Sequence, residues 1–332
     1  MATNDVFYPT GYSLTELTAA INEIPHVPTL LGDEGLFEYG GVSALTVQIE
    51  KQGQTLSLVS TKARGSAGAP IGRNTRDLRS FVLPHMPLDD AILADEVQGV
   101  RLFGTENQPT PFQRKLMDVM TLGKRRFDLT MEWQRVGALK GIVYDSDGTT
   151  VLYNYFTEFG VTQQTKAFLL TTSTTELRQI CSQVIDQIED ELGGVGFSGI
   201  IAYCGRTFWE QLITHPKAKE PYQNYTAALR LAGDPRERFE FGGITFVKYR
   251  GAANGSQMIA ATEAYIVPQG VPGLLLGRFG PADYVDTVNT MGLPLYAKGI
   301  EKRNGKGWDI EMQSNPLHFV TRPRAIIKAT NT

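Results

Sequence analysis

The sequence predicts an α+β protein with one long helix and several β-hairpins. Three observations support this class. Apolar residues recur at helical spacing over residues 112–139, and again over 175–192. At several places, segments in which apolar and polar residues alternate lie on both sides of a glycine-containing turn, the pattern of a β-hairpin. The chain has 34 glycines and 17 prolines, which supply many turns without making the sequence low in complexity. Its 332 residues are enough for a large core and for more than one lobe.

The first hundred residues predict a short helix, an open hairpin and a second short helix. Ser13 and Glu16 form a capping box before a helix that Pro25 ends. Residues 45–49 and 54–59 alternate around Gln52-Gly53, which predicts a hairpin whose second strand leads into a basic stretch. Residues 81–83, which follow the basic stretch, are expected to form the strand that leads the chain back from it. Residues 89–100 are expected to form a short helix.

The rest of the chain alternates between helices and hairpins. The helix at 112–139 would be about 40 Å long, and Lys124-Arg125-Arg126 indicate its polar side. A broad apolar stripe marks the helix at 175–192, which Gly193-Gly194 end. The remaining expectations are hairpins turning at Asp147-Gly148, Gly242-Gly243 and Arg303–Gly305, strands at 200–203 and 325–328, a strand and turn over 263–276, and short helices around 208–212 and 227–231. Gly53, Gly148, Gly242 and Gly243 are the predicted structural turns.

Charge and cysteine content limit the classes of function that the chain can have. The formal net charge is −3, whereas a protein that grips a nucleic-acid backbone usually presents a basic face. Cys181 and Cys204 lie inside apolar segments and are expected to be reduced. The N-terminus has no secretory signal, and no apolar run is long enough to span a membrane.

One stretch concentrates positive charge. Residues 62–80 read KARGSAGAPIGRNTRDLRS, with Lys62, Arg64, Arg73, Arg76 and Arg79 against the single acid Asp77, a local net charge of +4. Three interpretations remain open: a disordered loop, a nucleic-acid contact, or an arm that reaches a neighbouring subunit and pairs with carboxylates there. The nucleic-acid interpretation lacks interleaved aromatic residues that could stack on bases.

No motif assembles a catalytic, cofactor or metal site. Residues 194–199 match G-x-G-x-x-G, but a helix precedes them and a strand follows, the reverse of a dinucleotide site, so a helix cap and turn are expected. The four histidines, His26, His85, His215 and His318, lack metal-ligand spacing. A Cys-His nucleophile built on Cys204 is the less favoured alternative to a buried structural thiol. Residues 189–191 are expected to form a solvated acidic face.

A set of short motifs in order resembles the lambda-type major capsid proteins of tailed bacteriophages, the capsid protein E family. The motifs cover nearly the whole chain: MPLDDAILADEV at 86–97, GALKG at 137–141, DSDG at 145–148, FGG at 241–243, YRG at 249–251, RFGPAD at 278–283, VNTMGLP at 288–294, YAK at 296–298, GWDIEMQSNP at 307–316 and TRP at 321–323.

The resemblance implies the Hong Kong 97-type capsid fold and its parts. The N-terminal arm would be residues 1–40 and the extended β-hairpin loop 41–85. The peripheral domain would be 86–164 and 301–332, with a long spine helix at 112–139, and the axial domain 165–300. The basic stretch would be the tip of the extended loop, so Lys62, Arg64, Arg73, Arg76 and Arg79 become inter-subunit contacts.

The implied function is that of a major capsid protein, not an enzyme, with no cofactor. It would self-assemble as pentamers and hexamers into an icosahedral shell around double-stranded DNA, without sequence-specific binding and without a membrane. The implied partners are further copies of the chain, a scaffolding protein, a portal and a head decoration protein. Because the chain starts at Met1 with a short arm, a separate scaffold is expected. The location would be the virion capsid, assembled in the host bacterial cytoplasm. The alternatives are an encapsulin-like compartment protein, a nucleotide-binding enzyme and a nucleic-acid-binding protein.

Overall fold

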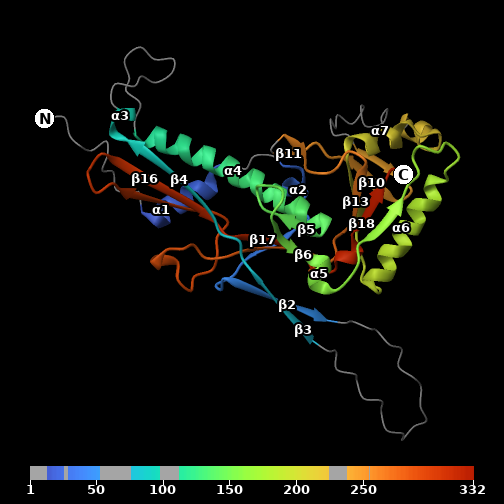
Figure 1. The fold of residues 1–332 in the computed structure, drawn as a ribbon, viewed down its shortest axis with the longest axis horizontal. Helices are drawn as coiled ribbons and strands as arrows, with labels where there is room; N and C mark the ends of the chain where they lie inside the picture. Colours follow the sequence, from blue (N-terminus) through green and yellow to red (C-terminus); the bar gives the residue numbers. More distant parts are fainter. Residues whose placement is uncertain (1–12, 26–28, 53–75, 98–111, 224–237, 254) are drawn as a thin grey trace, which may run out of the picture. The chain divides into compact units, whose positions relative to one another are not determined.

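The computed structural model describes residues 13–25, 29–52, 76–97, 112–223, 238–253 and 255–332 (Figure 1). The chain forms two compact units, which are described separately. Unit 1 consists of Met1–Val47, Val82–Gln134 and Gly277–His318, and unit 2 of Gln48–Phe81, Arg135–Leu276 and Phe319–Thr332. Helices and strands are mixed throughout, which confirms the α+β class.

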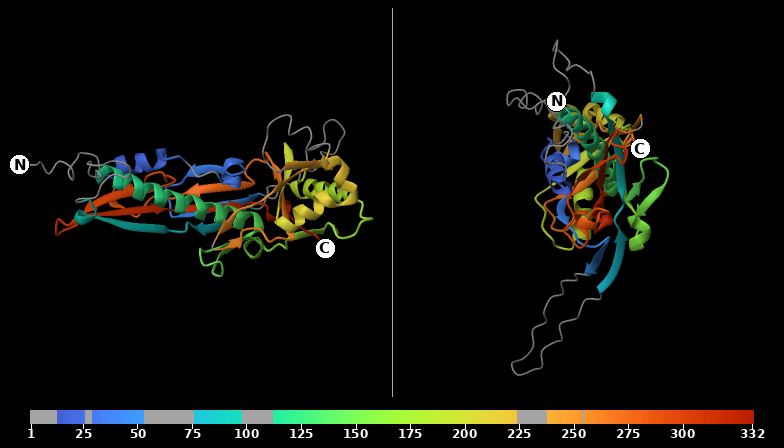
Figure 2. Two further views of the ribbon diagram at one scale, coloured as in Figure 1. Left: turned by 90° about the horizontal axis from the view of Figure 1, so that it is seen from above. Right: turned by 90° about the vertical axis from the view of Figure 1, so that its left-hand side faces the viewer.

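Unit 1 contains a three-stranded antiparallel sheet in the order β15-β16-β4. Its strands are Tyr296–Glu301, Gly307–Ser314 and Met86–Leu93, respectively. Helix α1 (Leu14–Glu23) packs on this sheet, and Figure 2 shows it in blue beside the strands. The Ser13 capping box is present. One face of the sheet joins α1 and α4 in a core that includes Leu17, Phe112, Met120, Ile310 and Met312.

Helix α4 is a single helix of 29 residues, Phe112–Lys140, where the sequence predicts one over 112–139. Its polar side differs from the expectation, because Arg125 and Arg126 are exposed whereas Lys124 is buried. Lys124 lies among the core positions Met120, Phe127 and Met131. A lysine can occupy such a position because its long aliphatic stem tolerates burial.

Smaller elements complete this part of the chain. A second three-stranded sheet has the order β1-β14-β17, with strands Glu38–Gly41, Leu275–Phe279 and Pro316–Val320. Short helices are α2 (Leu30–Asp33), α3 (Ala94–Val97) and the 3-10 turn η2 (Val285–Thr287). The N–H of Leu31 donates to the buried carboxylate of Glu132 at 3.0 Å, which ties α2 to α4.

Unit 2 is built on a six-stranded mixed sheet in the order β7-β18-β13-β8-β10-β9. The strands are Gln164–Ala167, Ile327–Thr330, Glu263–Gln269, Gly199–Cys204, Ile244–Lys248 and Arg238–Phe241. Helices α6 (Leu177–Leu192) and α7 (Arg206–Thr214) pack on it. The central strand β8 is buried from Ile200 to Cys204, which explains its continuous apolar run.

The remaining described elements are short. They are β2 (Thr46–Gln52), β3 (Arg76–Val82), β5 (Ile142–Tyr144), β6 (Val151–Asn154), α5 (Tyr155–Phe159), β11 (Ala252–Ala253), β12 (Ser256–Gln257) and the 3-10 turn η3 (Pro323–Ala325). The expected strand at 54–59 and helix at 227–231 lie outside the described residues. The closing strand begins at Ile327, because η3 occupies Pro323–Ala325.

The prediction of a helix over 89–100 is wrong for its first half. Strand β4 runs to Leu93, and α3 follows it at Ala94–Val97. Leu88 and Ile92 do fall four residues apart, as in a helix. They also lie on one face of a strand, and there they pack into the sheet's core. Pairing with β16 over eight residues decides in favour of the strand.

The hairpin at Asp147-Gly148 has a longer loop than the two-residue turn that the sequence favours. Tyr144 pairs with Val151, and the N–H of Gly148 donates to the carbonyl of Asp145 at 3.0 Å. Gly148 is left-handed, with φ 72°. The Asp147 carboxylate accepts from Thr149 and Thr150, and these bonds lower its pKa below the ordinary value.

We expect Gly148→Val to destabilise the hairpin by about 1–2 kcal/mol, because a β-branched residue is strained at positive φ. Nothing lies within 4 Å of the added Cβ, so the cost would come from the backbone alone. Gly148→Asn is the matched control, since asparagine tolerates this conformation. Thermal unfolding of the three proteins measures the difference, and equal melting temperatures for Val and Asn would refute the turn's role.

Candidate assembly surfaces

The glycine motif at 194–199 lies in a helix cap and not in a cofactor loop. Gly193 and Gly194 are left-handed at the end of α6, and β8 begins at Gly199. A strand therefore follows the glycines, and no helix N-terminus is available there to meet a phosphate. Gly242 and Gly243 are also left-handed, with φ 60° and 82°, in the β9–β10 turn. A Cβ at Gly242 would lie 2.7 Å from the Cβ of Cys181.

Both cysteines are buried in unit 2. Burial raises the pKa of the Cys181 thiol to about 12 and raises that of Cys204 further. The thiolate is the nucleophilic form of cysteine, so burial disfavours the reactive form of both side chains. The alternative of a catalytic Cys204 receives no support from its surroundings, because no histidine contact to it occurs among the described residues.

The histidines have structural roles where the structure describes them. His85 Nδ1 is hydrogen-bonded to Asn315 Oδ1 at 2.8 Å, and His318 Nδ1 lies 3.2 Å from Gln134 Oε1. His215 is buried and contacts the carbonyl of Thr172 at 3.0 Å. His26 lies outside the described residues. Within the described ranges, no group of three or more His, Cys, Asp or Glu side chains is suited to hold a metal ion.

The predicted contact residues of the extended loop are only partly described. Arg76 and Arg79 belong to β3, whereas Lys62, Arg64, Arg73 and Gly53 lie outside the described residues. Strands β2 and β3 form a two-stranded sheet of their own, with no third described strand on either edge. The end of this pair is anchored within unit 2, because Phe81 of β3 is buried and its ring lies 5.6 Å from that of Tyr153 and 5.9 Å from that of Tyr155.

The outer face of the β15-β16-β4 sheet is acidic. Pairing places Lys298, Glu311 and Asp89 in one row across the three strands, and Ile300, Asp309 and Ala91 in the next. The alternate residues, among them Ala297, Ile310 and Met312, point into the core. A hollow of about 490 Å³ is lined by Asp89, Asp90, Ala91, Ile300, Asp309 and Glu311. Asp90 pairs with Ile310 and so belongs to the alternate set, whereas the other five residues lie in the two outer rows. We call Asp89, Ala91, Ile300, Asp309 and Glu311 the acidic face.

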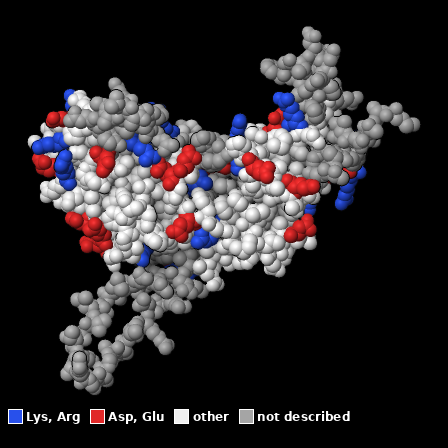
Figure 3. All heavy atoms as spheres, turned by 180° about the vertical axis from the view of Figure 1, so that it is seen from behind, with Lys and Arg blue, Asp and Glu red and all other residues white. Residues whose placement is uncertain are grey.

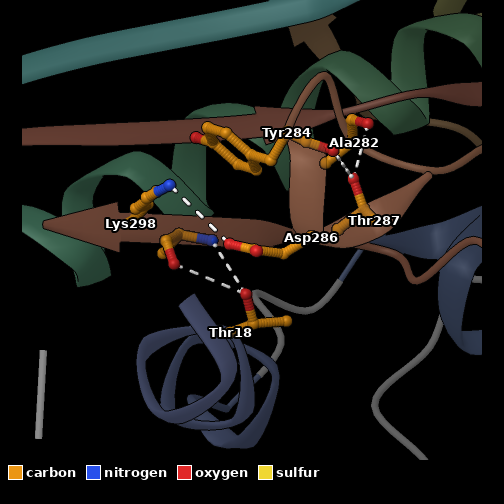
Figure 4. Close-up of polar contacts among 7 residues, drawn as sticks. Thr18, Ala282, Tyr284, Asp286, Thr287 and Lys298 are labelled. Carbon is orange, nitrogen blue, oxygen red and sulfur yellow. Dashed lines mark hydrogen bonds and ion pairs between the residues drawn. The ribbon is translucent and has the colours of Figure 1, made fainter. Parts of the chain in front are cut away.

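The lysines beside the acidic face already have anionic partners, and Figure 4 shows that of Lys298. Lys298 Nζ lies 3.9 Å from Asp286 Oδ2 and 5.0 Å from the centre of the Tyr284 ring. Lys302 pairs with Asp309. The pKa of Tyr284 is raised, first because burial disfavours the phenolate, and also because the carboxylates of Glu311 and Asp89 are close. No lysine or arginine of the described residues forms an ion pair with Asp89, Asp90 or Glu311.

The loop that carries Asp286 is held firmly. The Thr287 hydroxyl donates to the carbonyl of Ala282 at 2.7 Å, as Figure 4 shows. On the neighbouring strand, the N–H of Ala297 donates to the Thr18 hydroxyl at 3.2 Å, which ties β15 to α1. The loop also presents the exposed apolar side chains Val285 and Val288.

Sequence reasoning did not identify the acidic face. The available signal was the alternation in GWDIEMQS at 307–314, where Asp309 and Glu311 alternate with the apolar residues Trp308, Ile310 and Met312. That pattern marks a strand with one buried and one polar face. It does not reveal that Asp89, from a segment more than 200 residues earlier, lies in the same row.

The charges of the described residues form no broad basic face on the side that Figure 3 shows. Lysine and arginine side chains are interspersed there with aspartate and glutamate. No helix of the described chain is both long and apolar enough to cross a membrane.

Known proteins resemble this chain over almost all of its length. The family model described as phage major capsid protein E matches residues 13–331. The major capsid protein of Pseudomonas phage KPP10 is 29% identical over 340 residues, which cover 96% of each chain. That of Salmonella phage Felix O1 is 28% identical over 356 residues, covering 95% of each. A crystal structure of the putative capsid protein of a prophage of E. coli CFT073 superposes with a TM-score of 0.57 at 13% identity, over 98% of this chain and all of that one.

The fold is therefore the Hong Kong 97-type capsid fold, and the protein is a structural shell component and not an enzyme. The chain belongs to the phage major capsid protein E family. These findings confirm the family resemblance that the ordered motifs indicate. The matched relatives are named as capsid proteins, so the encapsulin-like and enzymatic alternatives gain no support from them.

Proposed function

We propose that copies of this chain assemble as pentamers and hexamers into an icosahedral shell that encloses the double-stranded DNA of a tailed bacteriophage. The observation that carries the proposal is the family match over residues 13–331. The physical basis is that head-to-tail interfaces generate rings when the rotation between copies closes. Many modest contacts then hold a shell together through avidity.

The proposed domains correspond to the parts of the capsid fold that the family resemblance implies. Residues 1–40 would be an N-terminal arm and 41–85 the extended loop, which contains β2 and β3. The peripheral domain, 86–164 and 301–332, would hold α4 and the acidic face. The axial domain, 165–300, would be built on the six-stranded sheet. Two strands adjust these bounds: β18 pairs with β13 and so would join the axial domain, and β15 pairs with β16 and so would join the peripheral domain.

The basic residues of the extended loop would contact a neighbouring subunit. Lys62, Arg64, Arg73, Arg76 and Arg79 lie in a stretch rich in small residues that offers little to a core. An arm that docks during assembly suits a two-stranded sheet that lacks a third described strand.

Further partners would be a scaffolding protein, a portal and a head decoration protein. The site of action would be the virion capsid, with assembly in the host bacterial cytoplasm. The chain's net charge of −3 fits a container that must not hold its genome by direct DNA contacts, because backbone binding relies on many lysines and arginines.

Sedimentation velocity on the purified full chain, with negative-stain microscopy of every fast fraction, tests the proposal. We expect pentamers, hexamers or closed shells, alone or after a candidate scaffolding protein is added. A strict monomer under both conditions would overturn the proposed function.

A further inference from the structure

We propose that copies of the chain meet through an apolar loop of unit 1, each loop packing on the same loop of another copy around a symmetry axis. The side chains that would make this self-contact are Val285, Val288, Met291 and Leu293, which we call the apolar loop. The inference rests on the proposed function, because it names a surface at which assembling copies would touch. The family match by itself identifies no such residues.

The apolar loop is more exposed than its residue types normally are. Val285 is 90% exposed, Val288 64%, Met291 63% and Leu293 44%. Single exposed apolar residues are common on protein surfaces, but these four lie within nine residues of one loop, and such clustering marks interaction sites. Fully burying a valine, leucine or methionine side chain contributes about 1.5–3 kcal/mol. A contact that covers the loop would therefore be favourable.

Hydrogen bonds within unit 1 give the loop a fixed shape. The buried Thr287 hydroxyl donates to the carbonyl of Ala282, and the Thr290 hydroxyl donates to the carbonyl of Thr287 at 2.8 Å. The N–H of Leu293 donates to the Tyr296 hydroxyl at 2.8 Å. A preformed surface loses little conformational entropy when a partner binds. The loop can therefore use most of the free energy of burying its apolar side chains for association.

The loop is almost free of charge, which allows it to meet an identical loop. Asp286 is the only charged residue between Tyr284 and Lys298, and Lys298 Nζ lies 3.9 Å from its carboxylate (Figure 4). Identical residues face one another around a symmetry axis, so a charged surface placed there would repel its own copy. An uncharged apolar surface avoids this repulsion.

Two other exposed surfaces are less suited to a contact between identical copies. On α4, Leu122 and Leu129 are exposed, but exposed Arg125 and Arg126 lie between them at helical spacing and share their face. Two such faces would bring guanidinium groups together. The acidic face would likewise set its carboxylates against one another. Of these three surfaces, only the apolar loop meets its own copy without repulsion.

A mixture of oppositely charged variants tests the self-contact. In Val288→Asp, identical carboxylates would meet across the axis, and in Val288→Lys identical ammonium groups would meet. We expect each variant alone to lose at least about tenfold of its shell fraction in sedimentation velocity, with partial recovery at high salt, which screens exposed charges. An equimolar mixture of the two should regain shells, because opposite charges then meet.

The outcomes separate the inference from the proposed function. Wild-type protein that forms no shells refutes the proposed function. Two results overturn only the inference: normal shells from both single variants, or a mixture that assembles no better than the better of its two components. In either case the loop does not meet its own copy. The control pair, Val151→Asp and Val151→Lys, alters a 50% exposed valine of β6 in unit 2 and should assemble as the wild type does.

Cross-linking keeps the test decisive if the charged variants fail to fold. Val285→Cys, Val288→Cys and Met291→Cys, made singly, leave the loop uncharged. In assembled shells, a short bismaleimide should join two identical positions and give a dimer on a denaturing gel for at least one of these variants. The wild type should give none, because Cys181 and Cys204 are buried. Well-formed shells from which dimers are absent in all three variants would overturn the self-contact.

Discussion

Reversing three charges in the basic arm should abolish shells while leaving the subunit folded. In the variant Arg73→Glu, Arg76→Glu, Arg79→Glu, the local net charge of residues 62–80 falls from +4 to −2. The proposed contact of the arm with carboxylates of a neighbouring subunit would then bring like charges together, which costs several kcal/mol at an interface. Since each 1.4 kcal/mol is tenfold in an equilibrium constant, we expect shell yield to fall by more than about a hundredfold. Sedimentation velocity measures the yield, and circular dichroism checks that the subunit is folded.

The matched control retains the charge and changes the side chain. Arg73→Lys, Arg76→Lys and Arg79→Lys should still assemble, with an optimum shifted to lower salt, because lysine lacks the bidentate geometry of the guanidinium group. If the triple glutamate variant assembles as the wild type does, the arm has no inter-subunit role.

Local signals in the sequence predicted much of the fold. The capping box at Ser13, the broad apolar stripe of α6 and the glycine turns at Gly242-Gly243 and Gly305 depend on neighbours a few residues away. Such features can be predicted because the residues that determine them are close in sequence and do not depend on tertiary contacts. The overall architecture came from the ordered set of family motifs and not from periodicity.

The features that could not be predicted are those that depend on pairing with strands far away in the sequence. The segment at 86–97 satisfies both a helical and a strand pattern, and only its pairing with β16 decides between them. The closing strand shows a similar limit, because its position in the six-stranded sheet is set by β13 and β7. Tertiary pairing commonly overrides a weak local preference.

The acidic face shows the same limit for function. Asp89 and Glu311 are unremarkable as single residues, and Asp89 lies in a segment that the sequence pattern predicts to be a helix. The β4–β16 register makes them neighbours. By contrast, the basic arm is evident from sequence alone, since its five cations lie within eighteen residues. The basic arm is therefore predictable from sequence alone, whereas the acidic face is not.

Replacing Gly292 with alanine should severely destabilise unit 1. Three segments meet there through backbone hydrogen bonds: the N–H of Gly292 donates to the carbonyl of Val42 at 3.0 Å, and the N–H of Val42 donates to the carbonyl of Phe279 at 2.8 Å. A Cβ on Gly292 would lie 1.9 Å from the Phe279 carbonyl oxygen. The methyl group can fit only if these backbones separate, which breaks both bonds. A buried donor left without a partner costs about 1–3 kcal/mol, so we expect a loss of about 3 kcal/mol or more.

Gly196→Ala is the control for this substitution, because a Cβ there would meet nothing within 4 Å. Thermal and urea unfolding of the two variants should give a melting temperature near that of the wild type for Gly196→Ala and a much lower one, with poor soluble yield, for Gly292→Ala. The junction also holds the base of the loop that carries Asp286, the partner of Lys298 beside the acidic face. Any Gly292→Ala subunits that fold should therefore assemble poorly, and wild-type stability and assembly in this variant would show that the three segments can separate without cost.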